Sequence, residues 1–471
     1  MYIQQLYTSC LSEAAYFIES NGEAVIIDPL RDVDEYIELA TLKKAKIKYI
    51  FETHFHADFV SGHLDLSKKT GAPIVYGPQA HTKFDAIHAT DGQEFKVGHL
   101  TIKVLHTPGH TMESTCYLLT DETGNPHCIF TGDTLFIGDV GRPDLSQKGE
   151  TTSEELAAIL YHSLQTKIMP LPNHILVYPA HGAGSSCGKN LSSDTFSTLG
   201  AQKETNYALQ PQTVEAFVAA VTNGLSAPPP YFPINAKINK EGYDSLDTVL
   251  KTALQPITPK ALKALIDADA DIIILDSRFA TVFTQGFIPT SIFIGLESRF
   301  AEWAGNVLPF NKQLIIVADI GKEKETAIRL SRVGLDNAIG YLEGGFEAWQ
   351  LAGYKTDMIV DIEADELAMD LKFDEKIVVL DVRKETEFAM EHVKDAENFP
   401  LQNINDALAM ALITDDEQYY VHCAGGYRSV IAASILKRQG LHNLRNVLGG
   451  FIAIKQVEGI TFAKEEAAVI L

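Results

Sequence analysis

Histidine and aspartate side chains recur in four short motifs within the first 250 residues of the chain. Imidazole nitrogens and carboxylate oxygens are ligands for first-row transition metals. Because the motifs follow apolar runs, as loops at the ends of strands do, we expect these side chains to converge on one metal site. The motifs are THFHAD (53–58), TPGHT (107–111), TGDTLF (131–136) and YPAHG (178–182), and they supply His54, His56, Asp58, His110, Asp133 and His181.

A cysteine with unusual surroundings lies in the segment YVHCAGGYRS. An apolar strand ends at Cys423, a six-residue loop runs from Cys423 to Arg428, and a helical pattern follows. This arrangement aims backbone N–H groups and a helix N-terminus at the sulfur, and both stabilise a sulfur anion. Gly425 and Gly426 permit the tight turn and, with Tyr427, are predicted to contact a substrate. Arg428 adds positive charge, so we predict a nucleophilic cysteine.

The elements that must position the first four motifs are strands separated by glycine-rich turns. The proline-rich segment SAPPPYFP (226–233) is incompatible with a helix interior or a central strand, so we place it on the approach to a domain boundary near residue 255. The predicted strands are AVIIDPL (24–30), IKYIFETH (47–54), APIVYG (72–77), LTIKVLHTPGH (100–110), CIFTGDTLF (128–136) and HILVYPAHG (174–182).

The rest of the chain contains an internal repeat with an offset of 105 residues (377 − 272). Two copies at this spacing indicate two domains rather than a solenoid, whose period would be shorter. Each copy alternates strands with helical segments, which predicts parallel α/β sheets. The matching segments are IIILDSR (272–278) with IVVLDVR (377–383), QLIIVA (313–318) with QYYVHC (418–423), and EGGFEAW (343–349) with LGGFIAI (448–454).

The composition indicates about three domains in 471 residues and argues against several partners. A balance of 39 basic against 62 acidic residues gives a net charge of −23, which repels nucleic acid. The chain has no apolar run of about 18 residues for a membrane span and no signal-peptide pattern. Its five cysteines form no CxxC pair or disulfide framework, which favours a reducing cytoplasm. Cys10, Cys116 and Cys128 lie in apolar runs and are predicted to be core residues.

The motif order HxHxD, GH, GD and AH resembles the metallo-β-lactamase superfamily, an αββα sandwich with its metals at one sheet edge. The resemblance covers about residues 1–250 and implies the fold, whereas the reaction stays open because this fold hosts many chemistries. Hydrolytic relatives such as glyoxalase II carry HxHxDH and bind two metals. Here Phe59 replaces the last histidine. A phenyl ring cannot ligate a metal, so one metal per chain is predicted.

Within the superfamily, the motifs THFHADF, TPGHT, TGDTLF and GDVGRPDL (138–145) resemble the persulfide dioxygenase branch. That resemblance implies one Fe(II) held by His54, His110 and Asp133. Two histidines and one carboxylate leave positions open for dioxygen and a sulfur anion. Zinc at the same ligands could not reduce oxygen, because zinc has no redox chemistry.

Five further residues are predicted to lie near this metal. His56, Asp58 and His181 are expected to orient the ligands or to donate hydrogen bonds. Arg142 is a candidate to bind a substrate carboxylate or phosphate, with a structural salt bridge as the alternative. The chain resembles proteins in which a persulfide dioxygenase is fused to a rhodanese, and these carry a cysteine at the position of Cys187. We therefore expect Cys187 to accept persulfide sulfur in a mobile loop near the metal, with a buried structural thiol as the alternative.

The segment around Cys423 resembles rhodanese, a sulfurtransferase, over about residues 360–471. LDVR (380–383) matches the family's Asp and Arg motif, and the six-residue loop matches its sulfur-handling members, whereas phosphatase relatives carry a longer loop. The first copy, about residues 256–355, keeps LDSR and GGF, but Ala318 stands at the position of Cys423. We predict that this copy is an inactive rhodanese-like domain that serves as a spacer or an interface.

The resemblances together predict a fusion that removes sulfide. Iron and O2 would oxidise the terminal sulfur of a low-molecular-weight persulfide to sulfite, and sulfite would attack a sulfane sulfur on Cys423 to give thiosulfate. The thiol stays open among glutathione, coenzyme A, bacillithiol and others, as does a homo-oligomer. The alternatives are a zinc-dependent thioester hydrolase of the glyoxalase II kind and a non-catalytic sulfur carrier or sensor. The predicted domains are an αββα metallo-β-lactamase sandwich (1–255) and two rhodanese-like α/β domains with parallel sheets, inactive (256–357) and active (358–471).

Overall fold

The computed structural model describes residues 1–145, 151–189, 191–374 and 376–465. The last residues of the predicted third domain, 466–471, lie outside the described residues. Contacts within the chain divide it into two units, which are Met1–Thr248 with Leu330–Gly334, and Val249–Arg329 with Leu335–Leu471. The domain boundaries at 255 and 357 stay predictions.

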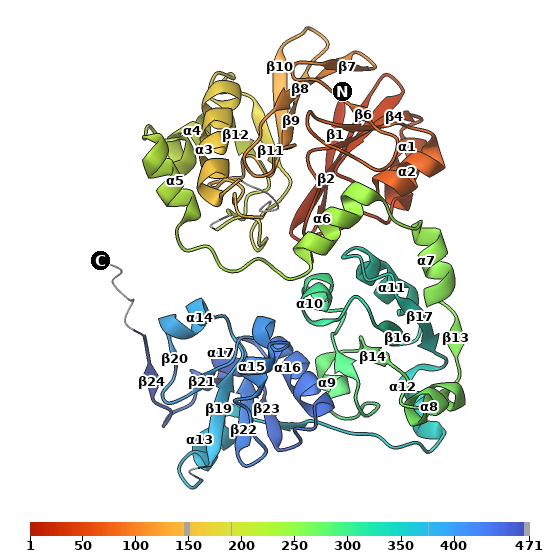
Figure 1. Cartoon of the computed structure of the whole chain (residues 1–471), viewed down its shortest axis with the longest axis vertical. Helices are drawn as coiled ribbons and strands as arrows, with labels where there is room; N and C mark the ends of the chain where they lie inside the picture. The colour runs from red at the N-terminus through yellow and green to blue at the C-terminus, as the bar shows by residue number, and fades with distance from the viewer. Residues whose placement is uncertain (146–150, 190, 375, 466–471) are drawn as a thin grey trace. The chain divides into compact units, whose positions relative to one another are not determined.

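Two six-stranded sheets face each other in the first unit (Figure 1), in the orders β1-β2-β3-β4-β5-β6 and β12-β11-β10-β9-β8-β7. All six predicted strands are present, but they are shorter than predicted. β4 stops at Glu52 and β10 at Gly132, so His54 and Asp133 stand in the loops that follow. The strands are β1 (Tyr2–Thr8), β2 (Glu13–Ser20), β3 (Glu23–Ile27), β4 (Lys46–Glu52), β5 (Ile74–Tyr76), β6 (Ile87–His88), β7 (Glu94–Val97), β8 (Leu100–His106), β9 (Thr115–Thr120), β10 (Pro126–Gly132), β11 (Leu176–Pro179) and β12 (Ser197–Thr198).

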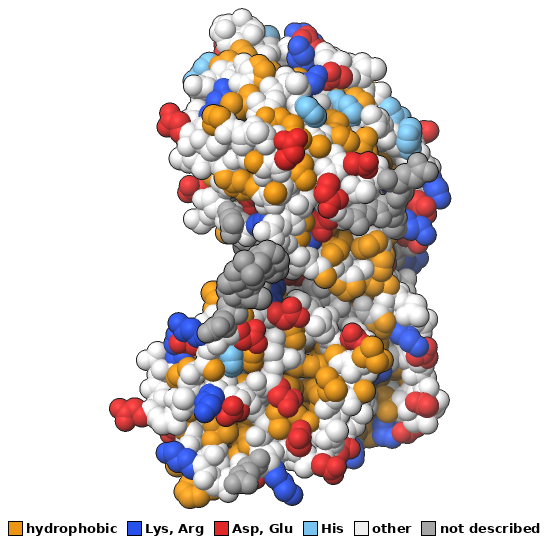
Figure 2. Space-filling view, turned by 60° about the vertical axis from the view of Figure 1, so that its left-hand side comes forward, with side chains coloured by type: hydrophobic (Ala, Val, Ile, Leu, Met, Phe, Trp, Pro, Cys, Tyr) orange, Lys and Arg blue, Asp and Glu red, His pale blue; other side chains and the backbone are white. Residues whose placement is uncertain are grey.

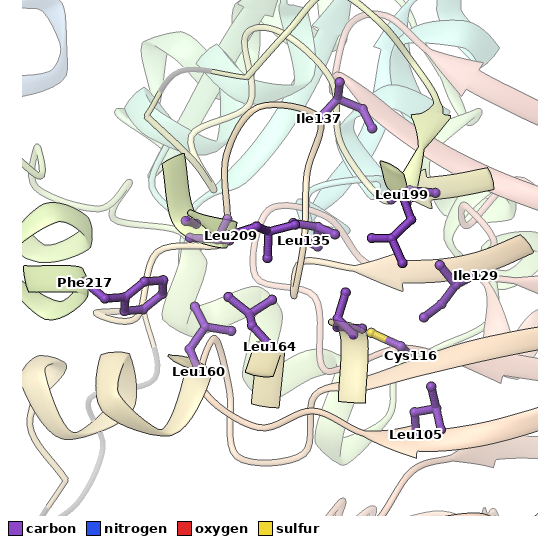
Figure 3. Close-up of a cluster of buried hydrophobic side chains, with 14 of the residues drawn as sticks. Leu105, Cys116, Ile129, Leu135, Ile137, Leu160, Leu164, Leu199, Leu209 and Phe217 are labelled. Atoms are coloured by element: carbon purple, nitrogen blue, oxygen red, sulfur yellow. The ribbon is translucent and has the colours of Figure 1, made fainter. Parts of the chain in front are cut away.

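Three apolar clusters hold this unit together as four layers. The central cluster joins the inner faces of the two sheets. A second packs the first sheet against α1 (Asp34–Leu42) and α2 (His63–Thr70). A third, shown in Figure 3, packs the second sheet against α3 (Ser153–Ser163) and α5 (Val214–Thr222), with Cys116 inside it. The predicted αββα order is confirmed, and apolar burial on both faces of each sheet explains it.

The three cysteines predicted to be core residues do not share one environment. Cys116 and Cys128 are buried in β9 and β10, and burial raises the pKa of Cys116 to about 11. Cys10 is only partly buried, so its prediction is wrong. It lies in the turn between β1 and β2, where Ser12 takes a positive φ of 53°. A turn at the end of a strand leaves one side of such a residue open to solvent.

The proline-rich segment ends in a helix rather than in a linker. Pro233 is the second residue of α6 (Phe232–Glu241), where the missing N–H breaks no helical hydrogen bond. Asn239 of α6 is fully buried and donates hydrogen bonds to the carbonyl oxygens of His56 and Phe59, both at 2.8 Å. The helix after the prolines therefore supports the metal motif. It is followed by α7 (Leu246–Ala253), and α4 (Leu199–Thr205) and α5 precede it in the chain.

The second unit contains two five-stranded sheets with equivalent orders, β13-β17-β16-β14-β15 and β18-β23-β22-β19-β21. All their strand pairs are parallel, as predicted. The first sheet consists of β13 (Pro256–Ile257), β14 (Ile272–Asp276), β15 (Ile292–Phe293), β16 (Gln313–Val317) and β17 (Ala338–Leu342). The second consists of β18 (Val360–Ile362), β19 (Ile377–Asp381), β21 (Glu397–Asn398), β22 (Gln418–His422) and β23 (Leu444–Val447), and β20 (His392–Val393) pairs with β24 (Phe462–Ala463).

Helices connect these parallel strands. In each sheet the middle strand, β16 or β22, ends directly before the loop that carries Ala318 or Cys423. The helices of the first repeat are α8 (Pro259–Asp267), α9 (Ala280–Phe283), α10 (Phe300–Val307), α11 (Glu323–Ser331) and α12 (Gly345–Leu351). Those of the second are α13 (Ala364–Asp370), α14 (Glu385–Met390), α15 (Ala407–Met410), α16 (Tyr427–Arg438) and α17 (Gly450–Ile454).

Charged side chains of both signs are visible on the surface. Within the described residues, no helix is long and apolar enough to cross a membrane. Figure 2 shows acidic side chains spread over the visible face and mixed with Lys and Arg.

Candidate functional site

The structure brings His54, His110 and Asp133 together at one edge of the two sheets. Each offers one ligand atom, and these atoms lie within 4.8 Å of one another. The Nε2 atoms of His110 and His54 lie 3.4 and 3.9 Å from Oδ2 of Asp133. All three side chains are buried, so the group forms a protected centre rather than a chance surface cluster.

Both histidines of this group are oriented by a hydrogen bond at their Nδ1 atom. His54 Nδ1 lies 3.0 Å from Oγ1 of Thr53, and that hydroxyl donates its hydrogen to Oδ2 of Asp28 at 2.8 Å. Nδ1 of His54 must therefore be the donor. His110 Nδ1 lies 2.9 Å from the carbonyl oxygen of Arg142, which can only accept. Both rings thus present an Nε2 lone pair, as a metal ligand requires.

The electrostatics of this group fit a bound divalent cation. Among the described residues, neither carboxylate oxygen of Asp133 has a hydrogen-bond partner, although both are buried. A buried, unpartnered carboxylate is strongly unfavourable without a compensating charge. Burial lowers the pKa of His54 well below its usual range, and its histidine neighbours lower it further. The neutral ring is the form that binds metal, so two nitrogens and one oxygen can hold an ion of the Fe(II) or Zn(II) type.

Asp58, His181 and Cys187 form a second group, again with ligand atoms within 4.8 Å of one another. His181 Nδ1 contacts the carbonyl oxygen of Ser12 at 3.1 Å, and its Nε2 lies 3.4 Å from Asp58 and 3.5 Å from Asp133. Burial alone would lower the pKa of His181, but Asp58 and Asp133 raise it. His181 can therefore hold a proton beside the metal group.

Cys187 lies next to the metal group, as expected, but its side chain is only 2% exposed. Burial raises the pKa of the Cys187 thiol well above its usual value, and the charges of Asp58 and Asp133 raise it further. A protonated thiol is a poor nucleophile. Without a bound cation, this environment favours the buried thiol over a persulfide acceptor.

His56 faces two carboxylates that the sequence analysis did not single out. Its Nε2 lies 3.0 Å from Oδ1 of Asp28 and 3.6 Å from Oε2 of Glu52. Burial raises the pKa of Glu52 well above its usual range. The Phe59 ring packs on the His56 ring with centroids 4.3 Å apart and is fully buried. Phe59 thus packs against His56 and supplies no metal ligand at the position where hydrolytic relatives carry a histidine.

Arg142 is engaged by protein groups. Its Nε and Nη2 donate to the two carboxylate oxygens of Asp144, both at 2.6 Å. Further hydrogen bonds reach the carbonyl oxygens of Ser186 and Ser226. With 4% exposure, this side chain favours the structural salt bridge over a substrate contact. Its backbone still matters for the site, because its carbonyl oxygen fixes His110.

The Cys423 loop directs a backbone donor at the sulfur. The Gly426 N–H donates to Sγ of Cys423 at 3.1 Å, and Oγ of Ser429 lies 3.7 Å from the same atom. Gly426 has a φ of +101°, in the left-handed region that favours glycine. A Cβ at Gly425 would have no neighbouring atom within 4 Å, so the loop is open above that residue. Tyr427 begins α16, whose N-terminus adds its partial positive charge.

Arg428 is held by a carboxylate beside the loop. Its Nη1 and Nη2 donate to Glu387 at 2.7 and 2.8 Å. Burial alone would lower the pKa of Arg428, but the hydrogen bonds and charge of Glu387 raise it. The guanidinium therefore stays charged at a fixed position near the sulfur. Sequence reasoning missed Glu387, although it lies only four residues after Arg383 of the LDVR motif.

Family comparisons agree with this division of the chain. Residues 9–181 match the model of the metallo-beta-lactamase superfamily, and residues 258–352 and 363–456 match that of the rhodanese-like domain. The crystal structure of a metallo-beta-lactamase from Staphylococcus aureus subsp. aureus COL is similar, with a TM-score of 0.64 and 32% sequence identity. That similarity covers 72% of this chain and 98% of the other.

Similar curated proteins divide between two chemistries. A probable hydroxyacylglutathione hydrolase of Schizosaccharomyces pombe is 30% identical over 191 residues, or 38% of this chain and 69% of that protein. The cytoplasmic hydroxyacylglutathione hydrolase of Arabidopsis thaliana is 32% identical over 180 residues, or 37% and 66%. The mitochondrial persulfide dioxygenase ETHE1 of Homo sapiens is 34% identical over 165 residues, or 34% and 59%. The chain thus spans about three fifths to two thirds of these relatives' length.

Proposed function

This chain belongs to the metallo-β-lactamase superfamily and carries two rhodanese-like domains, and on that premise we propose that it is an Fe(II) persulfide dioxygenase joined to a sulfurtransferase. The observation that carries the proposal is the presence in one chain of two centres suited to sulfur. One is the group of His54, His110 and Asp133, and the other is Cys423 with a backbone N–H on its sulfur. The proposed small-molecule partners are thiol persulfides, O2 and sulfite.

The residues of the first centre have distinct proposed roles. An Fe(II) ion held by His54, His110 and Asp133 would supply the redox chemistry that converts the terminal sulfur of a persulfide to sulfite. The hydrogen bonds at Nδ1 hold both imidazoles in the ligating tautomer. His181 holds a proton between Asp58 and Asp133 and can donate it as a hydrogen bond to an anionic sulfur or oxygen atom.

The second centre moves sulfur in two balanced steps. The Cys423 thiolate attacks the outer sulfur of a persulfide RS–SH, the S–S bond breaks, and RS⁻ leaves with the electron pair. Sulfite then attacks the outer sulfur of the Cys423 persulfide, which forms thiosulfate and returns the thiolate. The Gly426 N–H and the α16 N-terminus stabilise negative charge on the sulfur in both steps. Gly425, Gly426 and Tyr427 are the proposed substrate contacts.

We propose one iron per chain and the cytoplasm as its compartment. Phe59 removes a ligand from any second metal site and is fully buried against His56. All five cysteines are free thiols, which fits a reducing environment. We also propose that Cys187 accepts sulfur from a persulfide bound at the neighbouring metal group. A Cys187→Ser variant that leaves the ratio of sulfite to thiosulfate unchanged would remove that role.

A zinc-dependent thioester hydrolase is the second candidate. The hydroxyacylglutathione hydrolases among the similar proteins favour it, as does the group of Asp58, His181 and Cys187, which could hold another ion. The attached rhodanese-like domains favour the sulfur chemistry. The two candidates differ in whether the chain consumes O2 or hydrolyses a thioester, so one experiment separates them.

That experiment follows O2 uptake by the ferrous-loaded full chain with glutathione persulfide and with coenzyme A persulfide, while sulfite and thiosulfate are quantified. We expect O2 uptake and thiosulfate from the wild type, and sulfite in place of thiosulfate from Cys423→Ser. Cys10→Ser is the matched control, because Cys10 is partly exposed and outside both centres. Hydrolysis of S-lactoylglutathione without O2 uptake would overturn the proposal in favour of the hydrolase.

A further inference from the structure

We propose that the first rhodanese-like repeat, which has no thiol at its own loop, completes the substrate site of the second and selects persulfides that carry a primary ammonium group. The inference rests on the proposed sulfurtransferase function and names its donor class. It stands on a cavity that both repeats line, on the contacts that hold them together there, and on the two carboxylate side chains among the lining residues.

A cavity of about 330 Å³ lies against the Cys423 loop. Gly425, Gly426 and Tyr427 line it from the second repeat, and Thr284 and Glu297 line it from the first. Ligand pockets span roughly 300–1,000 Å³, so this one is at the small end. It suits a thiol of the size of an amino acid or short peptide better than one that carries a nucleotide.

The first repeat is fixed to the helix that starts at this loop. The Tyr427 hydroxyl donates to the carbonyl oxygen of Gly295 at 2.6 Å. The Phe293 N–H donates to Oγ of Ser434 at 3.0 Å, and Arg438 donates to the carbonyl oxygen of Thr290 at 2.7 Å. These contacts run along the length of α16, so the wall from the first repeat is held rigidly beside the loop.

The charge of this cavity is negative. Its charged lining residues are Glu297 and Asp361, and no Lys or Arg is among the described residues that line it. Asp361 is satisfied, because its two oxygens accept hydrogen bonds from Thr284 at 2.6 Å and from Asn446 at 2.7 Å. It also joins the repeats, since Thr284 belongs to the first and Asn446 to the second.

Glu297 is different, because one of its oxygens lacks a partner. Its Oε1 accepts the Ala280 N–H at 3.0 Å, whereas its Oε2 is buried without a hydrogen-bond partner among the described residues. Glu297 lines the cavity, and an ammonium group there would bring a positive charge and three N–H donors to this side chain. Ser298, the next residue, has a positive φ of 67°, a strained backbone position in the same wall.

This wall would orient one kind of sulfur donor. The ammonium group of RS–SH pairs with Glu297, and its S–S bond lies over Gly425 and Gly426, next to Cys423. The Cys423 thiolate forms a bond to the outer sulfur as the S–S bond breaks, and RS⁻ leaves with the electron pair, so no oxidant or reductant is needed. A thiol whose remote end carries only phosphates or carboxylates would face Glu297 and Asp361 with like charge.

The test compares cysteine persulfide with N-acetylcysteine persulfide, in which acetylation replaces the ammonium group with a neutral amide. The full-length chain is kept anaerobic, and sulfur transfer to Cys423 is followed by the mass of the protein. We expect kcat/KM in the wild type to favour cysteine persulfide by about fivefold to tenfold, as one partly buried ion pair gives. Glu297→Gln should abolish this preference, and Glu297→Asp, which keeps the charge, should retain part of it.

Glu347→Gln is the matched control, because Glu347 is an exposed carboxylate of the same repeat that lines a different cavity. It should keep the full preference. Transfer from thiosulfate to Cys423 verifies that the Glu297 variants keep an intact loop. Equal rates with both donors in the wild type, or an unchanged preference in Glu297→Gln, would overturn this inference and leave the proposed sulfurtransferase function standing. No transfer to Cys423 from any of the three donors would overturn the proposed sulfurtransferase function with it.

Discussion

The two rhodanese-like repeats share a scaffold and differ in one loop. Both sheets have the same strand order, and in each a buried Arg pairs with the Asp two residues before it, at 2.6 Å. Arg278 lies 4.2 Å from the Phe346 ring centroid, and Arg383 lies 3.8 Å from that of Phe451. The parts that specify the fold are thus the same in both repeats.

The loops after β16 and β22 show what the chemistry needs in addition. The Gly426 N–H donates to Sγ of Cys423, whereas the equivalent Gly321 N–H donates to Oε2 of Glu323 at 2.9 Å. Glu323 stands where the second repeat has Arg428. The first loop therefore satisfies its donor with its own carboxylate, so this N–H is not available to an anionic sulfur. A cavity of about 650 Å³ persists beside Ala318, so an empty space alone does not make a reactive site.

The largest expected effect comes from breaking what the repeats share. Asp381→Ala leaves Arg383 buried without its partner, and Asp276→Ala does the same to Arg278. Each substitution should lower the free energy of unfolding by about 3–5 kcal/mol, because an unpaired buried charge remains. Urea denaturation of the full chain measures this. Asp271→Ala is the control, since Asp271 is 77% exposed in its pair with Lys312 and should contribute less than about 1 kcal/mol.

A loss below 1 kcal/mol for both buried aspartates would contradict this account and would mean that the apolar clusters alone hold the repeats. A large loss in only one repeat would instead show that the shared pair has different weight in the two sheets. Sulfur transfer to Cys423 measured on the Asp276→Ala variant adds a second readout, because the first repeat also lines the cavity beside that loop.

The fold was predictable because its signals are local. The 105-residue repeat with its alternating strands and helices predicted the parallel sheets, and the order of the four motifs implied the αββα sandwich through its resemblance to a known superfamily. The same motifs were expected to converge, and His54, His110 and Asp133 do lie together. The supports of the site were not predictable in the same way. Asp28 and Thr53 are 25 residues apart, and Asn239 lies far along the chain from the His56 loop that it holds. Contacts of that kind depend on tertiary packing and leave no periodic pattern in the sequence.

The next prediction concerns whether a thiol alone is enough to make the first loop accept sulfur. In a Cys423→Ser background, Ala318→Cys should form a persulfide at least about 100-fold more slowly than Cys423 does in the wild type, because Glu323 occupies the Gly321 N–H and disfavours a sulfur anion. Adding Glu323→Arg should recover part of that rate. Mass spectrometry of the loop peptide after incubation with a persulfide measures both. Equal rates with and without Glu323→Arg would show that this carboxylate does not block the loop.

A smaller effect is expected from the glycines of the active loop. Gly426→Ala puts a Cβ at a φ of +101° and should cost about 1–2 kcal/mol, with about a tenfold slower sulfur transfer. Gly425→Ala is the matched control for stability, because its Cβ meets no atom within 4 Å. Thermal unfolding of both variants provides the comparison. Equal losses at the two glycines would mean that the backbone conformation of Gly426 does not matter.

The smallest expected effect concerns the pair that only the second repeat has, Glu387 with Arg428. Burial alone would raise the pKa of Glu387, but Arg428 holds it below the usual value of 4.5. A carboxylate with a lowered pKa contributes stability that is fully present above the unfolded pKa and is lost as the pH falls through the folded one. The contribution at neutral pH should be under about 1 kcal/mol, because the pair is partly exposed.

Glu387→Gln should therefore narrow the difference in stability between pH 7 and pH 3, as measured by denaturant unfolding at each pH. Its control is Glu343→Gln, an exposed carboxylate of the first repeat that should leave the pH profile unchanged. Sulfur transfer should fall by about threefold in Glu387→Gln, since Arg428 loses the partner that fixes its charge near Cys423. A normal rate combined with a flattened pH profile would mean that the pair stabilises the second repeat without positioning Arg428 for catalysis. The loops would then differ in chemistry through Cys423 and the Gly426 N–H alone.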